Sequence, residues 1–155
     1  PYTGWAPVHD AARNSGLGHH DGEFEPLHGH TFQVTLRLSG NPGDDGMLID
    51  FSEVKAGLRE AMAPLRRRTL IPGHAPEVRI TSENNTVSIS AGLKRYVFPA
   101  EDVVVLPLIN TTTEAIAEYL LERVLPHVHG YGLATVELEV SEAPDTSATA
   151  HFTFT

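Results

Sequence analysis

Three segments of the chain alternate apolar and polar residues with a period of two, which limits the possible folds more than any other feature. The segments are residues 31–39, 134–142 and 149–155. A strand sends successive side chains to opposite faces, so this alternation predicts strands with one buried and one solvated face. Antiparallel sheets commonly have this form. We therefore expect an antiparallel sheet that is covered on one side.

Two amphipathic helices are predicted to cover that side. Asp50 is placed as the N-cap of the first, with Glu53 three residues later and apolar residues at helical spacing over 51–65. The second helix is predicted over 110–125, where Glu114 follows a run of threonines and apolar residues again recur at helical spacing. Two helices on one face of an antiparallel sheet make an α+β fold.

A further group of strands is predicted between the helices. Two alternating runs, 78–81 and 86–90, are separated by Ser-Glu-Asn-Asn, and residues 94–98 form a third short run. We interpret about residues 73–99 as an inserted β-hairpin with a short edge element. No linker rich in Pro, Gly or Ser divides the sequence. We therefore expect one domain over residues 1–155, with a four-stranded main sheet whose open edges favour oligomers.

Composition argues against several functions. Twenty Asp and Glu residues against eleven Lys and Arg give a formal charge of −9, which repels nucleic-acid backbones and anionic membranes. The sequence has no cysteine, so disulfides, thiolate nucleophiles and cysteine-ligated metals are excluded. No apolar run in the sequence approaches the length of roughly eighteen residues that a helix needs to span a bilayer. We expect a soluble, cytoplasmic protein that binds neither nucleic acid nor membranes.

The sequence His28-Gly29-His30 stands at the start of the segment 31–39. Residues i and i+2 of a strand share a face, so the two imidazoles are expected to lie side by side. Neutral imidazole is a good zinc ligand, and a catalytic zinc ion takes three protein ligands with a fourth position open. The pair is therefore a candidate zinc site that needs a third ligand. The alternative interpretation is two surface histidines on an edge strand.

Four motifs in order resemble those of the 6-pyruvoyl-tetrahydropterin and 6-carboxytetrahydropterin synthase family. They are Leu-His-Gly-His at 27–30, Gly-Met-Leu-Ile-Asp-Phe at 46–51, Asn-Thr-Thr-Thr-Glu at 110–114 and Val-Ser-Glu at 140–142. The resemblance spans nearly the whole chain and includes a bacterial subgroup with an insertion between the helices. It implies a tunnelling fold (T-fold) whose subunits form a β-barrel. It also implies a homo-oligomer, commonly a hexamer of two stacked rings, with active sites at subunit interfaces.

The resemblance also implies a binding site for a small, pterin-like substrate. In the family, a buried glutamate accepts hydrogen bonds from the 2-amino group and a ring N–H of the pterin, and it corresponds to Glu142 here. Thr112 and Thr113 correspond to residues that complete this anchor. Without the resemblance, Glu142 would be interpreted as a solvated carboxylate at a strand end, and the threonines as a helix N-cap.

The third zinc ligand of the family is a histidine in a first-strand motif Phe-x-Ala-Ala-His, and two alignments are possible. The ungapped alignment places Arg13 at the ligand position, where a guanidinium cannot coordinate zinc. The other alignment matches residues 5–9 and makes His9 the ligand, with a following loop longer by four residues. His19 or His20 from that loop is a further candidate.

The catalytic position departs from the common family pattern. The usual cysteine lies four residues before the first histidine of His-Gly-His, where this chain has Phe24. Glu25 precedes His28 by three residues, as in a subfamily that uses a glutamate instead. Those enzymes are associated with cleaving the side chain of dihydroneopterin triphosphate to give 6-hydroxymethyl-dihydropterin. Glu25 is therefore the candidate general base, with a solvated loop glutamate as the alternative.

A second departure follows the first helix, where Arg66 and Arg67 replace an Asp-His pair that the family uses as an acid/base relay. These arginines are interpreted either as a solvated basic turn or as a clamp for substrate phosphate or carboxylate that includes Arg67. Two functions therefore remain. One is a metal-assisted lyase or retro-aldol enzyme acting on a dihydropterin side chain. The other is a repurposed T-fold protein that binds a pterin-like or other small molecule without zinc.

Overall fold

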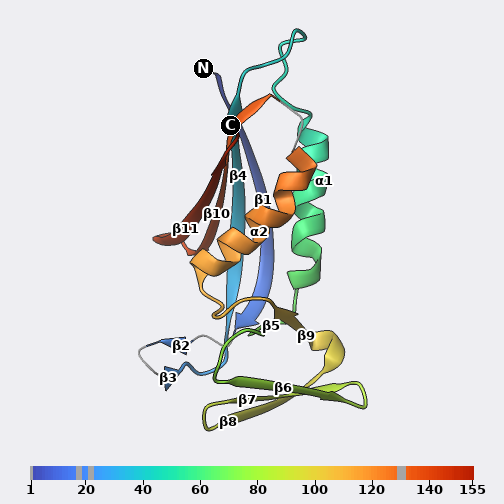
Figure 1. Ribbon diagram of the computed structural model, residues 1–155, viewed down its shortest axis with the longest axis vertical. Helices are drawn as coiled ribbons and strands as arrows, with labels where there is room; N and C mark the ends of the chain where they lie inside the picture. The colour runs from blue at the N-terminus through green and yellow to red at the C-terminus, as the bar shows by residue number, and fades with distance from the viewer. Residues whose placement is uncertain (1, 17–18, 21–22, 129–131) are drawn as a thin grey trace.

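The structure is a computed structural model that describes residues 2–16, 19–20, 23–128 and 132–155, with side chains described for 23–128 and 132–155. Figure 1 shows long strands running beside two helices, with a small separate sheet at one end of the molecule. None of the helices in these described ranges is both long and apolar enough to cross a membrane. The elements in chain order are β1 (Tyr2–Gly16), β2 (His19–His20), β3 (Glu23–Phe24), β4 (His28–Gly40), α1 (Phe51–Met62), η1 (Ala63–Leu65), β5 (Thr69–Pro72), β6 (Val78–Glu83), β7 (Thr86–Ala91), β8 (Lys94–Pro99), η2 (Ala100–Asp102), β9 (Val103–Leu106), α2 (Thr113–Val128), β10 (Leu133–Ala143) and β11 (Thr146–Thr153).

The main sheet has six strands in the order β11-β10-β4-β1-β5-β9. The four long strands pair antiparallel, as predicted, whereas β5 and β9 add a parallel extension beside β1. The prediction of four strands was therefore wrong. The two extra strands span only residues 69–72 and 103–106, and they are mostly apolar without a clear alternation. Short buried parallel strands of this kind lack the period-two signal on which the prediction rested.

The core lies between the main sheet and the two helices (Figure 1), and β4 shows how the sequence builds it. From Phe32 to Leu38, every second residue of β4 points into this core, where each is at most 6% exposed: Phe32, Val34, Leu36 and Leu38. The helices supply the opposite side through Val54, Leu58, Met62, Ile116, Leu120 and Val124. Burial of each such side chain stabilises the fold by roughly 1.5–3 kcal/mol.

Both helix starts are capped by side chains, as the sequence predicts. The Asp50 carboxylate accepts hydrogen bonds from the hydroxyl and the backbone N–H of Ser52, both at 2.7 Å, and these bonds lower the pKa of Asp50 below its usual 3.8. At the second helix, the Thr112 hydroxyl accepts from the backbone N–H of Ala115 at 3.2 Å. Thr112 therefore acts as an N-cap, and α2 runs from Thr113 to Val128, slightly beyond the predicted end.

Gly57 marks a close approach between α1 and α2. A Cβ atom added to Gly57 would lie 2.5 Å from Cβ and 2.6 Å from Cγ of His127. Alanine has the better helix propensity by about 1 kcal/mol, but no rotamer change can relieve a clash with Cβ. We expect Gly57→Ala to overpack the contact and lower the free energy of unfolding by a net amount of about 1–2 kcal/mol in urea denaturation.

The matched control for this prediction is Gly132→Ala. A Cβ atom at Gly132 would meet only the Asn41 carbonyl oxygen, at an ordinary contact distance of 3.5 Å. We expect the midpoint of urea unfolding of this control to equal that of the wild type. If Gly57→Ala were as stable as the wild type, the close helix crossing described here would be wrong.

The inserted segment forms a three-stranded antiparallel sheet, β6-β7-β8. The third predicted run is a full strand rather than a short edge element, because residues 94–99 pair with 86–91 along their whole length. Asn84 and Asn85 form the first turn with positive φ angles of 48° and 61°, as two-residue hairpin turns require. The sheet has its own buried cluster, in which Val87 and Ile89 of β7 join residues of β5 and β9.

Candidate active site

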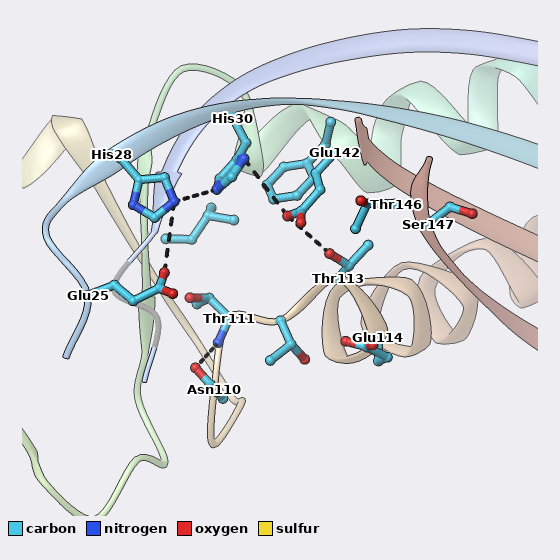
Figure 2. Close-up of a pocket in the computed structure, with 13 residues that line it drawn as sticks. Glu25, His28, His30, Asn110, Thr111, Thr113, Glu114, Glu142, Thr146 and Ser147 are labelled. Carbon is cyan, nitrogen blue, oxygen red and sulfur yellow. Dashed lines mark hydrogen bonds and ion pairs between the residues drawn. The ribbon is translucent and has the colours of Figure 1, made fainter. Parts of the chain in front are cut away.

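A cavity of about 350 Å³ lies where β4, the end of β10 and the start of α2 meet (Figure 2). The structure places six of the candidate site residues in its lining: Glu25, His28, His30, Thr112, Thr113 and Glu142. They come from three parts of the chain that are far apart in sequence: residues 25–30, 112–113 and 142. The fold therefore gathers the two histidines, two carboxylates and two threonine hydroxyls around one space.

The two histidines point their Nε2 atoms toward one another, 2.7 Å apart, at the end of the cavity near Glu25. His28 Nδ1 lies 2.8 Å from the backbone oxygen of Pro26. A carbonyl oxygen can only accept, so Nδ1 carries the proton of that bond and the Nε2 atom of a neutral His28 ring presents a lone pair. Metal-binding histidines are usually oriented in this way, with the second nitrogen held by a carbonyl.

Glu25 lies on the short segment between β3 and β4, on the same side of the cavity as the histidine pair. Its Oε2 atom is 3.9 Å from Nε2 of His28. Both side chains are close to half exposed, at 46% and 44%. A carboxylate and two imidazole nitrogens thus face a part of the cavity that solvent and a small molecule can enter.

Glu142 lies farther along the cavity, between His30 and the start of α2 (Figure 2). Its Oε2 atom accepts a hydrogen bond from the Thr113 hydroxyl at 3.3 Å and lies 3.8 Å from Nδ1 of His30. The two threonines therefore have different positions. Thr113 orients the Glu142 carboxylate, whereas the Thr112 hydroxyl is the helix N-cap.

Seven further residues line the cavity and were not among the predicted site residues: Phe32, Leu70, Asn110, Thr111, Glu114, Thr146 and Ser147. Asn110 and Thr111 belong to the motif at 110–114, so the sequence contained a signal for them. The Asn110 side chain accepts from the backbone N–H of Thr111 at 2.9 Å. Thr146 and Ser147 follow the turn between β10 and β11, where no sequence pattern marks a site.

The candidate third zinc ligands lie on β1 and β2, whose side chains are outside the described residues. The backbone register places Asn14 opposite His30 and Arg13 opposite Thr31. The register shifts between Ala6 and Asp10, and Asp10 pairs with Val34. The backbone of His9 therefore lies more than four residues along β4 from His30, which is more than roughly 13 Å at the usual strand rise, and the register does not bring it beside the histidine pair. His19 and His20 form β2.

Arg67 does not line the cavity. It is exposed and follows the 3-10 turn η1, with a positive φ of 56° that is uncommon for a residue with a side chain. Such a backbone conformation fits a tight turn between η1 and β5. Within one subunit, the structure therefore keeps Arg67 apart from the residues that face the cavity.

The side chains that line the cavity supply only part of a zinc site. His28 and His30 present two nitrogens to one place, and the Pro26 carbonyl holds the first ring as metal ligands are held. Among the side chains of residues 23–128 and 132–155, no group of three His, Asp or Glu residues is arranged to hold a metal ion. A zinc ion with three protein ligands would take its third from outside those side chains.

Comparison with known proteins agrees with this arrangement of motifs. The family model described as "6-pyruvoyl tetrahydropterin synthase" matches residues 10–151. The chain belongs to this family. A Pyrococcus abyssi protein named "Putative 6-carboxy-5,6,7,8-tetrahydropterin synthase" is 31% identical over 118 residues, which are 76% of this chain and 69% of that protein. A Methanocaldococcus jannaschii protein of the same name is 28% identical over 117 residues, 74% of this chain and 72% of that one.

Solved structures of the 6-pyruvoyl tetrahydropterin synthase family confirm the predicted α+β T-fold. The crystal structure of the Plasmodium vivax synthase superposes with a TM-score of 0.90 at 28% identity, over 99% of this chain and 100% of that one. A variant of that synthase matches equally well at 27% identity, and its description calls the replaced glutamate a catalytic residue. Family members of this kind therefore share the fold at low sequence identity, and this chain is a divergent member.

Proposed function

We propose that this chain is a lyase of the 6-pyruvoyl tetrahydropterin synthase type that cleaves the side chain of a dihydropterin, such as dihydroneopterin triphosphate, by retro-aldol chemistry. One observation carries the proposal. Glu25 and the histidine pair lie at one end of a single cavity, and Glu142 with Thr113 lies farther along it (Figure 2). The first group suits proton transfer and metal binding, and the second suits recognition of a heterocycle.

Glu142 and Thr113 are proposed to hold the pterin ring. A carboxylate can accept two parallel hydrogen bonds from the 2-amino group and the adjacent ring N–H of a pterin. The Thr113 hydroxyl fixes the carboxylate through its 3.3 Å hydrogen bond. The substrate side chain is attached at C6, on the opposite edge of the bicyclic ring from the 2-amino group. A ring bound to Glu142 therefore directs its side chain away from that residue, toward the rest of the cavity.

Glu25 is proposed to act as the general base. In the retro-aldol step its carboxylate takes the proton of the 2′-hydroxyl, the C1′–C2′ bond breaks, and C2′ becomes an aldehyde. The electron pair of that bond passes into the dihydropterin ring, and C1′ is then protonated. The products are 6-hydroxymethyl-dihydropterin and a two-carbon aldehyde that carries the triphosphate. A zinc ion bound by His28 and His30 would polarise the side-chain oxygens.

The site of an isolated subunit is open, which supports a homo-oligomer as part of the proposal. Glu25 and His28 are close to half exposed, and the outermost strand β11 presents Phe152 with 41% of its surface accessible. An unpaired strand edge with apolar side chains favours pairing with another chain. We propose a hexamer of two stacked rings in which a neighbouring subunit covers the cavity and excludes water from it.

Metal content tests the zinc part of the proposal without relying on activity. After dialysis against trace zinc, we expect elemental analysis of the wild type to find about one zinc ion per subunit. His28→Ala should lose most of it, because one of the two converging nitrogens is removed. His74→Ala is the matched control, since His74 is exposed and does not line the cavity. His9→Ala and His19→Ala variants identify the third ligand.

A wild-type protein that stays free of metal would overturn zinc-dependent chemistry for this chain. The remaining function would then be the metal-free binding of a pterin-like molecule at Glu142. The structure contains one observation in favour of that alternative, because only two imidazole nitrogens converge among the described side chains. Metal analysis therefore separates the two functions directly.

A further inference from the structure

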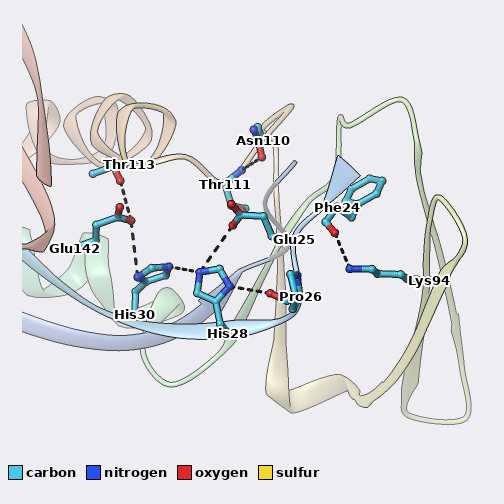
Figure 3. Close-up of polar contacts among 10 residues, drawn as sticks. All are labelled: Phe24, Glu25, Pro26, His28, His30, Lys94, Asn110, Thr111, Thr113 and Glu142. Carbon is cyan, nitrogen blue, oxygen red and sulfur yellow. Dashed lines mark hydrogen bonds and ion pairs between the residues drawn. The ribbon is translucent and has the colours of Figure 1, made fainter. Parts of the chain in front are cut away.

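The inserted sheet contacts the segment that carries Glu25 (Figure 3). The Nζ atom of Lys94, the first residue of β8, donates a hydrogen bond of 2.6 Å to the backbone oxygen of Phe24. Phe24 directly precedes Glu25 in the sequence. A cation that donates to a carbonyl makes a charge-assisted bond, which is stronger than a bond between neutral groups. This bond therefore ties the inserted sheet to the residue next to the proposed base.

The same two segments also meet through an apolar contact. A Cβ atom added to Gly92 would lie 3.4 Å from Cδ2 and 3.6 Å from Cε2 of Phe24, so the aromatic ring lies against the glycine backbone. Gly92 has a φ of 58° in the turn between β7 and β8, a conformation that glycine adopts without strain. The ring contact and the Lys94 bond thus hold Phe24 at two points.

The inserted sheet is a firm support for these contacts. Its middle strand β7 is paired on both sides, and Ile89 of that strand is 1% exposed in the cluster shared with Ile71 and Val103. Ile71 belongs to β5 and Val103 to β9, so the cluster joins the insertion to the main sheet. By contrast, residues 25–27 form neither helix nor strand. The position of Glu25 therefore depends on the contacts made by its neighbours.

We propose that Lys94 is a positioning residue, which holds Glu25 at the His28 end of the cavity through the backbone of Phe24. The inference rests on the proposed function, in which Glu25 is the base. It gives the insertion a role in the reaction, because the turn between β7 and β8 and the first residue of β8 hold the segment before His-Gly-His. Lys94 does not touch the cavity, so it acts through Glu25 and not on the substrate.

The test compares Lys94→Met, which keeps the length of the side chain but removes the donor, with Lys94→Arg, which retains one. Arg95→Met is the matched control, because Arg95 is the exposed neighbour on the same strand. With dihydroneopterin triphosphate as substrate, we expect Lys94→Met to lower kcat by about 10- to 100-fold, since small misplacements of catalytic groups have effects of this size. KM and the melting temperature should stay at wild-type values, and Lys94→Arg should recover most of the lost rate.

Hydrogen exchange provides a second readout that does not need turnover. We expect the backbone amides of residues 24–27 to exchange faster in Lys94→Met than in the wild type, while those of β10 and α2 are unchanged. Unchanged exchange in that segment would overturn the inference, as would a normal kcat despite faster exchange. If the wild type shows no turnover, the proposed function fails, and the exchange data alone then decide whether Lys94 holds this segment.

Discussion

Glu25→Gln is expected to lower kcat with dihydroneopterin triphosphate by about 10²- to 10⁴-fold, the range in which a positioned acid or base contributes. Glutamine has the size and shape of glutamate, but its amide cannot accept the 2′-hydroxyl proton. The affinity for an unreactive pterin such as biopterin should stay at the wild-type value, because ring recognition is assigned to Glu142. Steady-state kinetics and a fluorescence titration measure the two effects separately.

The matched control for this variant is Glu23→Gln. Glu23 is an exposed glutamate two residues earlier, on β3, and it does not line the cavity. Its replacement changes the net charge by the same amount and should leave kcat unchanged. Equal activity of Glu25→Gln and the wild type would remove Glu25 from the mechanism and leave the lyase proposal without a base.

Glu142→Gln is expected to weaken the binding of biopterin by about 30- to 150-fold. Glutamine keeps one oxygen acceptor but turns an NH₂ group toward the second N–H donor of the pterin. The lost charge-assisted hydrogen bond corresponds to about 2–3 kcal/mol. Isothermal titration calorimetry of the wild type and the variant with biopterin measures the dissociation constants directly, whether or not the protein holds a metal ion.

Glu137→Gln is the control for the second variant, because Glu137 lies on the same strand, β10, but does not line the cavity. We expect its biopterin affinity to match the wild type. An unchanged affinity in Glu142→Gln would show that the pterin ring binds elsewhere. It would also leave the hydrogen bond from Thr113 without a role in recognition.

The main elements of the fold were predictable because their signals are local. Alternation over residues 31–39 predicted β4, and the Asp50 cap with helical spacing predicted α1. The parallel strands β5 and β9 were missed, because four-residue apolar runs carry no periodicity of their own. Their pairing depends on β1, which is distant in sequence, and such a contact becomes visible only when the fold is assembled.

The candidate site was predictable only in part, since six of the candidate residues line one cavity but Arg67 does not, and seven other lining residues were not predicted. The resemblance selected Glu25, His28 and Glu142, and the structure places all three in one cavity. The sequence could not distinguish the roles of the two threonines, since both fit a helix N-cap and a ligand contact. Nor could it show that Lys94, 70 residues from Phe24, reaches the segment before the histidine pair. Such contacts follow from tertiary packing rather than from a motif.

The most direct test of the lyase proposal is an analysis of the products formed from dihydroneopterin triphosphate by the zinc-loaded wild-type protein. Chromatography with mass spectrometry should show 6-hydroxymethyl-dihydropterin and a two-carbon aldehyde triphosphate appearing in equal amounts as the substrate disappears. Formation should depend on Glu25 and on the histidine pair. Unchanged substrate in the presence of stoichiometric zinc, or a product that retains the C1′–C2′ bond, would contradict the proposed cleavage.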